Sequence, residues 1–195
     1  MPRYLVLHCT DYSFRIKNNQ LKDVDSWHKD RGFPLSSKGY FCGYHYLITG
    51  DKVYQCREDN EIGAHCNQEF DGKNVYPPQS GKALSVNVQS VSVCVGFDGD
   101  IEMPTPKMYD LLQKKVWELQ DKYEIPNNRV LFHRFFAKNK SCPGSLITDQ
   151  WLTDLLTRPK PIVENKISTC IVDNEVAKKP SIWDNLFALI RNANS

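Results

Sequence analysis

The sequence has no long apolar run, no strong charge of one sign and no closely paired cysteines. None of its apolar stretches approaches the roughly 18 residues that a transmembrane helix needs, so a membrane-spanning segment is not expected. A net charge of +2 is too small to favour nucleic acid or a charged membrane surface as the partner. These absences leave a globular protein of ordinary composition, 41% apolar and 25% charged.

Seven cysteines are present, but no Cys-x-x-Cys pair supports a structural zinc ribbon. The start Met1-Pro2-Arg3 leads directly into four apolar residues, too few for the apolar part of a secretory signal. We therefore expect synthesis in the cytoplasm, where thiols are kept reduced. An odd number of cysteines there argues against a disulfide framework, so most should be small core residues.

Hydrophobic periodicity predicts strands that alternate with helices. Strands are expected at 4–7, 40–47, 52–55, 85–97 and 130–132, and helices at 18–31, 105–123 and 147–156. Thr49-Gly50-Asp51 should close a hairpin, and 67–82 should be a polar loop beside a cleft. The order predicts an α/β fold: a single domain with a mixed central β-sheet flanked by helices.

A proline-rich linker beginning at residue 158 marks a boundary. Residues 1–157 should form the main domain, and 158–195 a C-terminal extension. The apolar stripe over 182–190 predicts a short amphipathic helix in this extension, which either docks on the domain or binds a partner or a polymer surface.

The segment from His133 to Gly144 places a histidine, Lys140 and Cys142 within ten positions, directly after a predicted strand. His8 follows another predicted strand, and the carboxyl ends of strands in such sheets usually carry sites. Two imidazoles and one thiolate with a fourth position open are typical of catalytic zinc. A lone histidine or cysteine is more often structural, so spacing alone leaves both interpretations open.

Six motifs occur in a fixed order along the chain: Leu7-His8-Cys9-Thr10, residues 27–33 (WHKDRGF), Gly43-Tyr44-His45-Tyr46, Ile62-Gly63-Ala64-His65, residues 90–94 (SVSVC) and 133–144. Through them residues 5–147 resemble the type-2 N-acetylmuramoyl-L-alanine amidases. These phage lysozyme-like zinc amidases share their fold with peptidoglycan recognition proteins.

The resemblance implies a Zn²⁺ ion held by His8, His133 and Cys142, with Tyr44 and Lys140 as catalytic partners. Zinc lowers the pKa of bound water towards neutrality, and a cationic lysine can stabilise the oxyanion of amide hydrolysis.

The resemblance also places His65 near the cleft, as a substrate-binding residue. His28 and His45 are interpreted as structural, and Cys9 and Cys66 are expected to point away from the site. Ser92 stands where the family commonly has glycine, which bears on the shape of the cleft.

The expected function is zinc-dependent hydrolysis of the amide between N-acetylmuramic acid and L-alanine in peptidoglycan, in a bacteriolytic phage-type endolysin that reaches the wall after release. The alternatives are a cytosolic amidase that recycles wall fragments, a non-catalytic peptidoglycan-binding module, and a cysteine hydrolase using Cys142 and His133. A regulatory protein partner is a further possibility that the sequence does not test.

Overall fold

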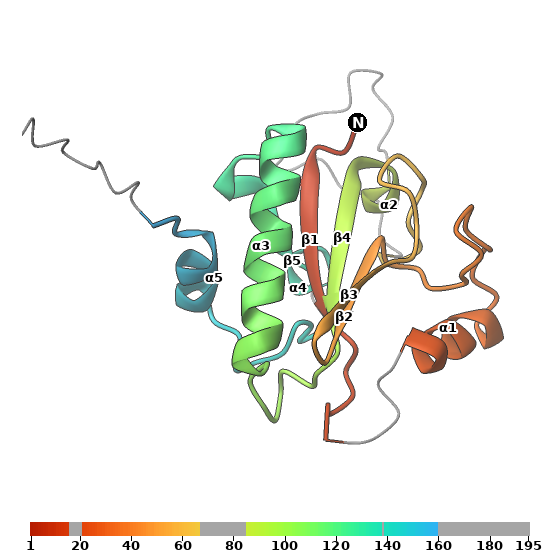
Figure 1. Ribbon diagram of the computed structural model, residues 1–195, viewed down its shortest axis with the longest axis horizontal. Coiled ribbons are helices and arrows are strands. Elements are labelled where there is room, and N and C mark those ends of the chain that lie inside the picture. The colour runs from red at the N-terminus through yellow and green to blue at the C-terminus, as the bar shows by residue number, and fades with distance from the viewer. Residues whose placement is uncertain (16–20, 67–84, 138, 160–195) are drawn as a thin grey trace, which may run out of the picture. The chain divides into compact units, whose positions relative to one another are not determined.

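The computed structural model describes residues 1–15, 21–66, 85–137 and 139–159. A five-stranded sheet in the order β3-β2-β4-β1-β5 forms its centre (Figure 1). Its strands are β1 (Tyr4–Cys9), β2 (Tyr46–Thr49), β3 (Lys52–Gln55), β4 (Ser90–Val95) and β5 (Val130–Phe132). Only the edge strand β3 is antiparallel, paired with β2 through the predicted hairpin. The predicted α/β fold with a mixed sheet is confirmed.

The two central strands are buried along their whole length. Every residue of β1 and β4 is buried, as expected for parallel strands covered on both faces. Because the parallel strands share a direction, their carboxyl ends lie along one edge of the sheet. That edge carries the candidate site.

The helices are α1 (Leu21–Asp30), α2 (Val86–Gln89), α3 (Pro106–Tyr123), α4 (His133–Phe136) and α5 (Asp149–Leu156), with a 3₁₀ turn η1 (Asn127–Arg129). The long helix α3 packs on the sheet, and α5 packs on α3 (Figure 1). Helix α3 begins at the predicted position. The Thr105 hydroxyl accepts a hydrogen bond from the N–H of Met108, and Pro106 is the first helical residue.

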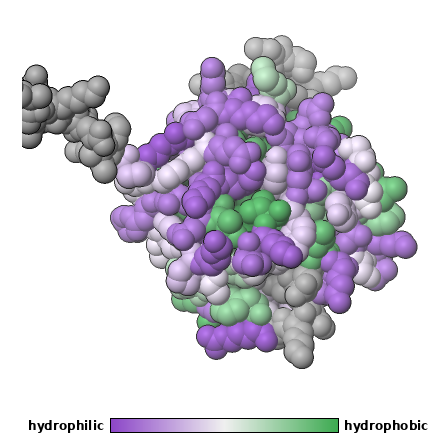
Figure 2. All heavy atoms as spheres, in the orientation of Figure 1, coloured by the Kyte–Doolittle hydropathy of each residue, from purple (hydrophilic) through white to green (hydrophobic). Residues whose placement is uncertain are grey.

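The buried side of α3 carries an apolar stripe at helical spacing, Met108, Leu112, Val116 and Leu119. Its exposed positions are charged, for example Lys107, Lys114 and Glu118. The face of the molecule seen in Figure 2 is accordingly hydrophilic over most of its area, with a small hydrophobic area near its centre.

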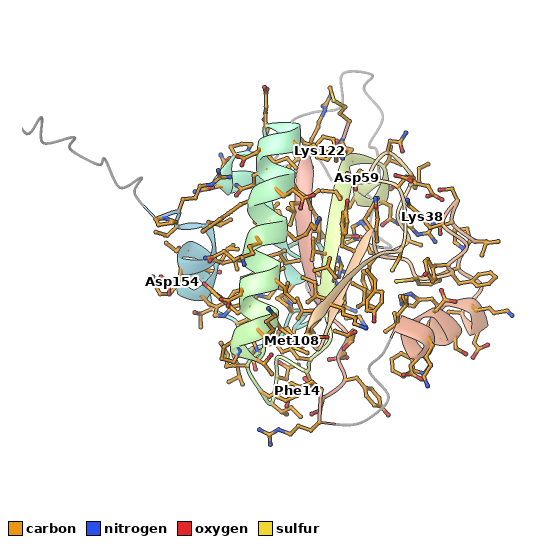
Figure 3. All side chains as sticks on the ribbon, viewed as in Figure 1. Phe14, Lys38, Asp59, Met108, Lys122 and Asp154 are labelled. Atoms are coloured by element: carbon orange, nitrogen blue, oxygen red, sulfur yellow. The ribbon has the colours of Figure 1, made fainter. Side chains whose placement is uncertain are left out.

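A buried carboxylate joins α3 to the segment after β3. Asp59 accepts hydrogen bonds from the hydroxyls of Tyr46 and Tyr123 and pairs with Lys122 at 2.8 Å (Figure 3). Burial alone would raise the pKa of Asp59, but these hydrogen bonds outweigh it and lower the pKa. The contact fixes the end of α3 against the hairpin.

Two predicted strand boundaries are wrong. Residues 40–45 are not a strand, because side chains take up their backbone N–H groups: Asp25 accepts from Phe41 and Cys42, and His28 accepts from Gly43. Residues 86–89 form the helical turn α2, and the strand begins only at Ser90.

None of the helices that the structure describes is long and apolar enough to cross a membrane. The expected loop at 67–82 and the amphipathic helix at 182–190 lie outside the described residues, and the boundary at 157/158 stays a prediction.

Candidate active site

Three side chains from separate parts of the chain meet at the carboxyl edge of the sheet. His8 lies near the end of β1, and His133 follows β5 directly, as the first residue of α4. Leu7 and Phe132 are paired in register on these adjacent strands, so the two histidines lie side by side, with ring centroids 4.6 Å apart. Cys142 arrives from the loop after α4, its Sγ 3.8 Å from His8 Nδ1.

The spacing of these atoms fits a zinc ion. One nitrogen of each histidine and the Cys142 sulfur lie within 4.8 Å of one another. A sulfur at about 2.3 Å and a nitrogen at about 2.05 Å from one tetrahedral zinc ion lie about 3.6 Å apart. This is close to the 3.8 Å between Cys142 Sγ and His8 Nδ1. Two imidazoles and one thiol are also a donor set that zinc prefers.

The two histidines are in the neutral form that a metal requires, whereas the thiol must lose its proton to bind one. Burial lowers the pKa of His8 well below its usual value. It lowers the pKa of His133 to about 4, with the charge of Lys140 as a second cause. The side-chain hydrogen bond shared with the Cys9 thiol, together with burial, raises the pKa of the Cys142 thiol. The metal-free site at neutral pH therefore holds two neutral imidazoles and a protonated thiol.

The loop that carries Cys142 is fastened at several points. Arg134 donates from its guanidinium to the carbonyls of Gly144 and Ile147, and its backbone N–H donates to the carbonyl of Cys142 at 2.8 Å. The Asp100 carboxylate accepts from the hydroxyl of Ser141 on the same loop.

A glycine contact brings this loop close to the turn after β4. Gly99 approaches so closely that a methyl group on its Cα would overlap the carbonyl of Pro143. Gly144 has a φ of 113°, a conformation that favours glycine.

Tyr44 lies beside the histidines, its ring centroid 5.1 Å from that of His8. Burial raises the pKa of Tyr44 well above its usual value, so the phenol keeps its proton and remains a hydrogen-bond donor.

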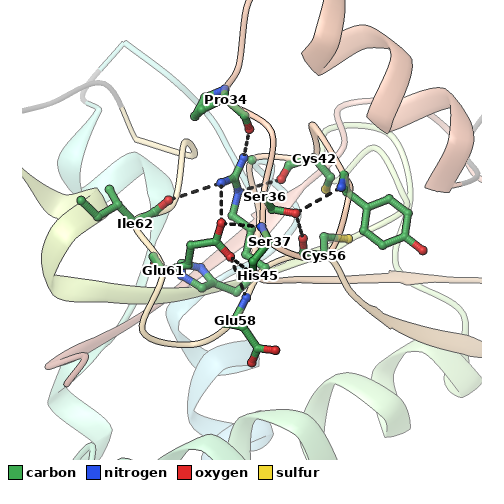
Figure 4. A network of polar contacts seen from close by, with 12 residues as sticks. Pro34, Ser36, Ser37, Cys42, His45, Cys56, Glu58, Glu61 and Ile62 are labelled. Atoms are coloured by element: carbon green, nitrogen blue, oxygen red, sulfur yellow. Dashed lines mark hydrogen bonds and ion pairs between the residues drawn. The ribbon is translucent and has the colours of Figure 1, made fainter.

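The segment that carries Tyr44 is held by the buried Arg57. The Arg57 guanidinium donates to the carbonyls of Cys42 and Pro34 and pairs with Glu61, three residues that are labelled in Figure 4. These bonds join three chain segments, so Tyr44 is presented by a fixed loop and not by a strand as predicted.

A cavity of about 440 Å³ opens over the cluster. Its walls include Tyr44, His65, His133, Cys142 and the exposed Lys140. This volume is within the usual range for small-molecule sites. The structure thus brings all six predicted site residues to one place.

His65 is bonded to the protein through both ring nitrogens, to His8 at 3.0 Å and to Ser90 at 3.1 Å. The other histidines also make protein contacts. His28 accepts from Gly43 and stacks on Phe33, and His45 bonds to Ser92 and to the carbonyl of Glu61.

Two expectations about the surroundings are wrong. Cys9 does not point away from the site, because its N–H donates to the Cys142 sulfur at 3.4 Å and its own sulfur lies 4.0 Å from the same atom. Ser92 is fully buried and bonds to His45, so it supports the core and does not line the cavity.

The sequence analysis assigned no role to Ser90, Arg134 or Asp100, although Ser90 and Arg134 lie within motifs of the resemblance. Each acts through a bond to a site residue or its loop, and the sequence does not reveal such contacts.

Two further groups of possible ligands are engaged in hydrogen bonds within the protein. His8, His65 and Cys66 are close together, but His8 and His65 are already joined by a direct hydrogen bond. Asp11, Asp98 and Asp100 form a largely exposed acidic group, and the two oxygens of Asp100 accept from the Ser141 hydroxyl and the Ser145 N–H, one each.

Comparison with protein families finds one whose model, described as N-acetylmuramoyl-L-alanine amidase, matches residues 1–145. A search of curated proteins gave no match.

Several solved structures share the fold. The endolysin N-acetylmuramoyl-L-alanine amidase LysCS from Clostridium intestinale URNW superposes with a TM-score of 0.58 at 22% identity, covering 78% of this chain and 82% of its own. The endolysin of Thermus scotoductus MAT2119 bacteriophage Ph2119 superposes with a TM-score of 0.58 at 20% identity, covering 80% of this chain and 86% of its own. Drosophila PGRP-LB gives 0.56 at 22% identity, covering 81% of each chain. At these identities the likeness establishes the fold.

Proposed function

The chain belongs to the N-acetylmuramoyl-L-alanine amidase family, and from that premise we propose that it is a zinc-dependent hydrolase of the amide between N-acetylmuramic acid and L-alanine in peptidoglycan. The observation that carries the proposal is the convergence of His8, His133 and Cys142, of which His133 and Cys142 line a cavity together with Tyr44 and Lys140. Three protein ligands beside an open cavity are the arrangement that catalytic zinc requires.

A zinc ion held there would supply Lewis-acid chemistry, activating water and polarising the amide carbonyl. The protein groups supply the rest. Lys140 places a positive charge at the rim, where it can stabilise the negative charge that develops on the amide oxygen. Tyr44 keeps its proton and can donate a hydrogen bond to the substrate or to the attacking water.

We further propose that the protein acts on the bacterial cell wall, as a phage-type endolysin. The solved structures that share its fold include endolysins, which supports this setting. The second candidate, a recycling amidase, would act on soluble anhydro-muropeptides. An amidase named AmiD from E. coli, with the substrate anhydro-N-acetylmuramic acid-L-Ala-D-gamma-Glu-L-Lys, also shares the fold, at 17% identity and a TM-score of 0.52.

Digestion of purified cell wall tests the reaction. An amidase releases new L-alanine amino groups and no reducing sugars, whereas release of reducing sugars would contradict the proposal. Activity on soluble anhydro-muropeptides without clearing of whole wall would favour the recycling amidase. Binding to wall without release of either product would favour the non-catalytic module.

Chelation separates the metal enzyme from a cysteine hydrolase. Treatment with a chelator should abolish release of L-alanine amino groups, and added zinc should restore it. Activity that survives complete removal of zinc would support a thiol enzyme. Cys142→Ser should lose zinc and activity together, because a hydroxyl is a poor zinc ligand. Cys56→Ala, a matched loss of a buried thiol outside the site, should retain both.

A further inference from the structure

A chain of hydrogen bonds runs from His8 away from the cavity into the protein. His8 Nε2 lies 3.0 Å from His65 Nδ1, and His65 Nε2 lies 3.1 Å from the Ser90 hydroxyl. That hydroxyl lies 2.6 Å from the backbone carbonyl of Val86. The two rings are buried and come from distant parts of the chain.

The carbonyl at the end of the chain fixes the direction of every bond. A carbonyl only accepts, so the single proton of the Ser90 hydroxyl is donated to Val86. The hydroxyl must then accept from His65, which places the proton of the neutral His65 ring on Nε2. The bare Nδ1 of His65 can only accept, so His8 must carry its own proton on Nε2.

The consequence appears on the other side of the His8 ring. With its proton on Nε2, a neutral His8 keeps a free lone pair on Nδ1, the nitrogen that faces the Cys142 sulfur at 3.8 Å. The opposite tautomer would put a proton between His8 and the place where the metal would lie.

We propose that His65 and Ser90 are positioning residues that hold His8 in the one tautomer and ring orientation able to bind the metal through Nδ1. This inference rests on the proposed zinc site. It replaces the expected substrate contact of His65 with a role exerted through His8.

The surroundings of His65 hold its ring in place. The Asn87 side chain accepts from the N–H groups of His65 and Cys66 and donates to the carbonyl of Cys66. At Gly63 a methyl group would overlap the His65 ring, so the chain passes directly against it.

Two other roles for His65 fit the geometry less well. A polar contact with substrate would have to break one of its two hydrogen bonds, because both nitrogens are engaged. A second metal between His8 and His65 would have to replace the hydrogen bond that joins their facing nitrogens at 3.0 Å.

Zinc affinity and the tautomer of His8 test the proposal in purified protein. Affinity is measured by competition with a chromophoric chelator, and the tautomer by ¹⁵N NMR of the imidazole rings in the metal-free protein. The wild type should carry its His8 proton on Nε2. His65→Ala should lower zinc affinity about 10–100-fold, the range for losing such a supporting group.

Substitutions that keep or remove one bond sharpen the test. Asn at position 65 offers an oxygen where Nδ1 lies, so His65→Asn should recover most of the affinity that His65→Ala loses. Ser90→Ala leaves the ring in place but removes its acceptor, and should shift the His8 tautomer and weaken zinc binding. His45→Asn, at a buried histidine with no bond to His8, is the matched control and should retain zinc affinity.

The results separate this inference from the proposed function. A wild-type protein that binds no zinc would contradict the proposed function itself. A wild type that binds zinc, together with unchanged affinity and His8 tautomer in His65→Ala and Ser90→Ala, would contradict only the role of His65. If His65→Ala does not fold, His65→Asn and Ser90→Ala decide the question by the same two measurements.

Discussion

At the scale of single residues, the candidate site combines groups whose charges are set by burial. His8 and His133 are kept neutral, Tyr44 is kept protonated, and Lys140 supplies positive charge from an exposed position at the rim. This combination suits a site that must bind a divalent metal and also stabilise a developing negative charge.

Loss of Lys140 should separate metal binding from turnover. Lys140→Ala should retain zinc but lower turnover by about 10²–10³, the cost of losing one group that stabilises an oxyanion. It should also raise the pKa of His133 in the metal-free protein, because the charge of Lys140 helps to lower it. Lys107→Ala, on the exposed side of α3, is the control. Normal turnover of Lys140→Ala would remove this residue from the reaction.

The stability of the metal-free protein should fall in mild acid. An unfolded histidine has a pKa near 6.5, whereas that of His133 is about 4 in the folded protein. As the pH falls from about 6.5 towards 4, the unfolded chain binds protons that the folded protein does not, so the free energy of unfolding decreases. For His133 the loss reaches roughly 3 kcal/mol near pH 4.

Denaturant unfolding at a series of pH values measures this loss. Removing the titrating ring in His133→Gln should make the dependence between pH 6.5 and 4 shallower by the share of His133, while His8 and His65, whose pKa values burial also lowers, keep the rest. A stability that stays constant over this range in the metal-free wild type would contradict the assigned protonation states.

The six candidate residues could be predicted because each belongs to a motif of the resemblance, and two follow parallel strands. The hydrogen bonds that support these residues could not be predicted from the sequence. The bond from His65 to His8 spans 57 positions, and that from Cys9 to Cys142 spans 133. Neither residue type nor spacing reveals such bonds, because they depend on how loops pack in three dimensions.

At the scale of elements, local signals decided some boundaries and tertiary contacts decided others. The hairpin between β2 and β3 and the start of α3 were predicted correctly, because turn and cap residues act within a few positions. The segment 40–45 was predicted wrongly, because acceptors on α1 satisfy its backbone. The apolar pattern alone does not show that these N–H groups have partners other than a strand.

The contact between Gly99 and the Pro143–Gly144 turn gives a prediction for the metal-binding loop. Gly99→Ala should push this turn away and displace Cys142, lowering zinc affinity about 10–100-fold, as expected when a ligand loses its support. Zinc titration by chelator competition measures the effect. Gly50→Ala, at the open tip of the hairpin, is strained by its φ of 59° and should lower stability but not zinc affinity. Equal zinc affinity of Gly99→Ala and the wild type would show that the loop does not depend on this contact.

At the scale of the whole molecule, the site joins β1, β5 and the loop after α4, so metal binding should stabilise the fold. A ligand that binds only the folded state at about 1,000 times its dissociation constant adds about 4 kcal/mol to the free energy of unfolding. Zinc should therefore raise the melting temperature of the wild type and have a much smaller effect on Cys142→Ser. An equal shift in both proteins would place the zinc elsewhere.

The most direct measurement is X-ray absorption at the zinc edge of the loaded protein. The account predicts one sulfur at about 2.3 Å and two imidazole nitrogens at about 2.0–2.1 Å, with an oxygen from solvent completing the shell. A shell without sulfur, or one with a second sulfur from the nearby Cys9, would contradict an open site built from His8, His133 and Cys142.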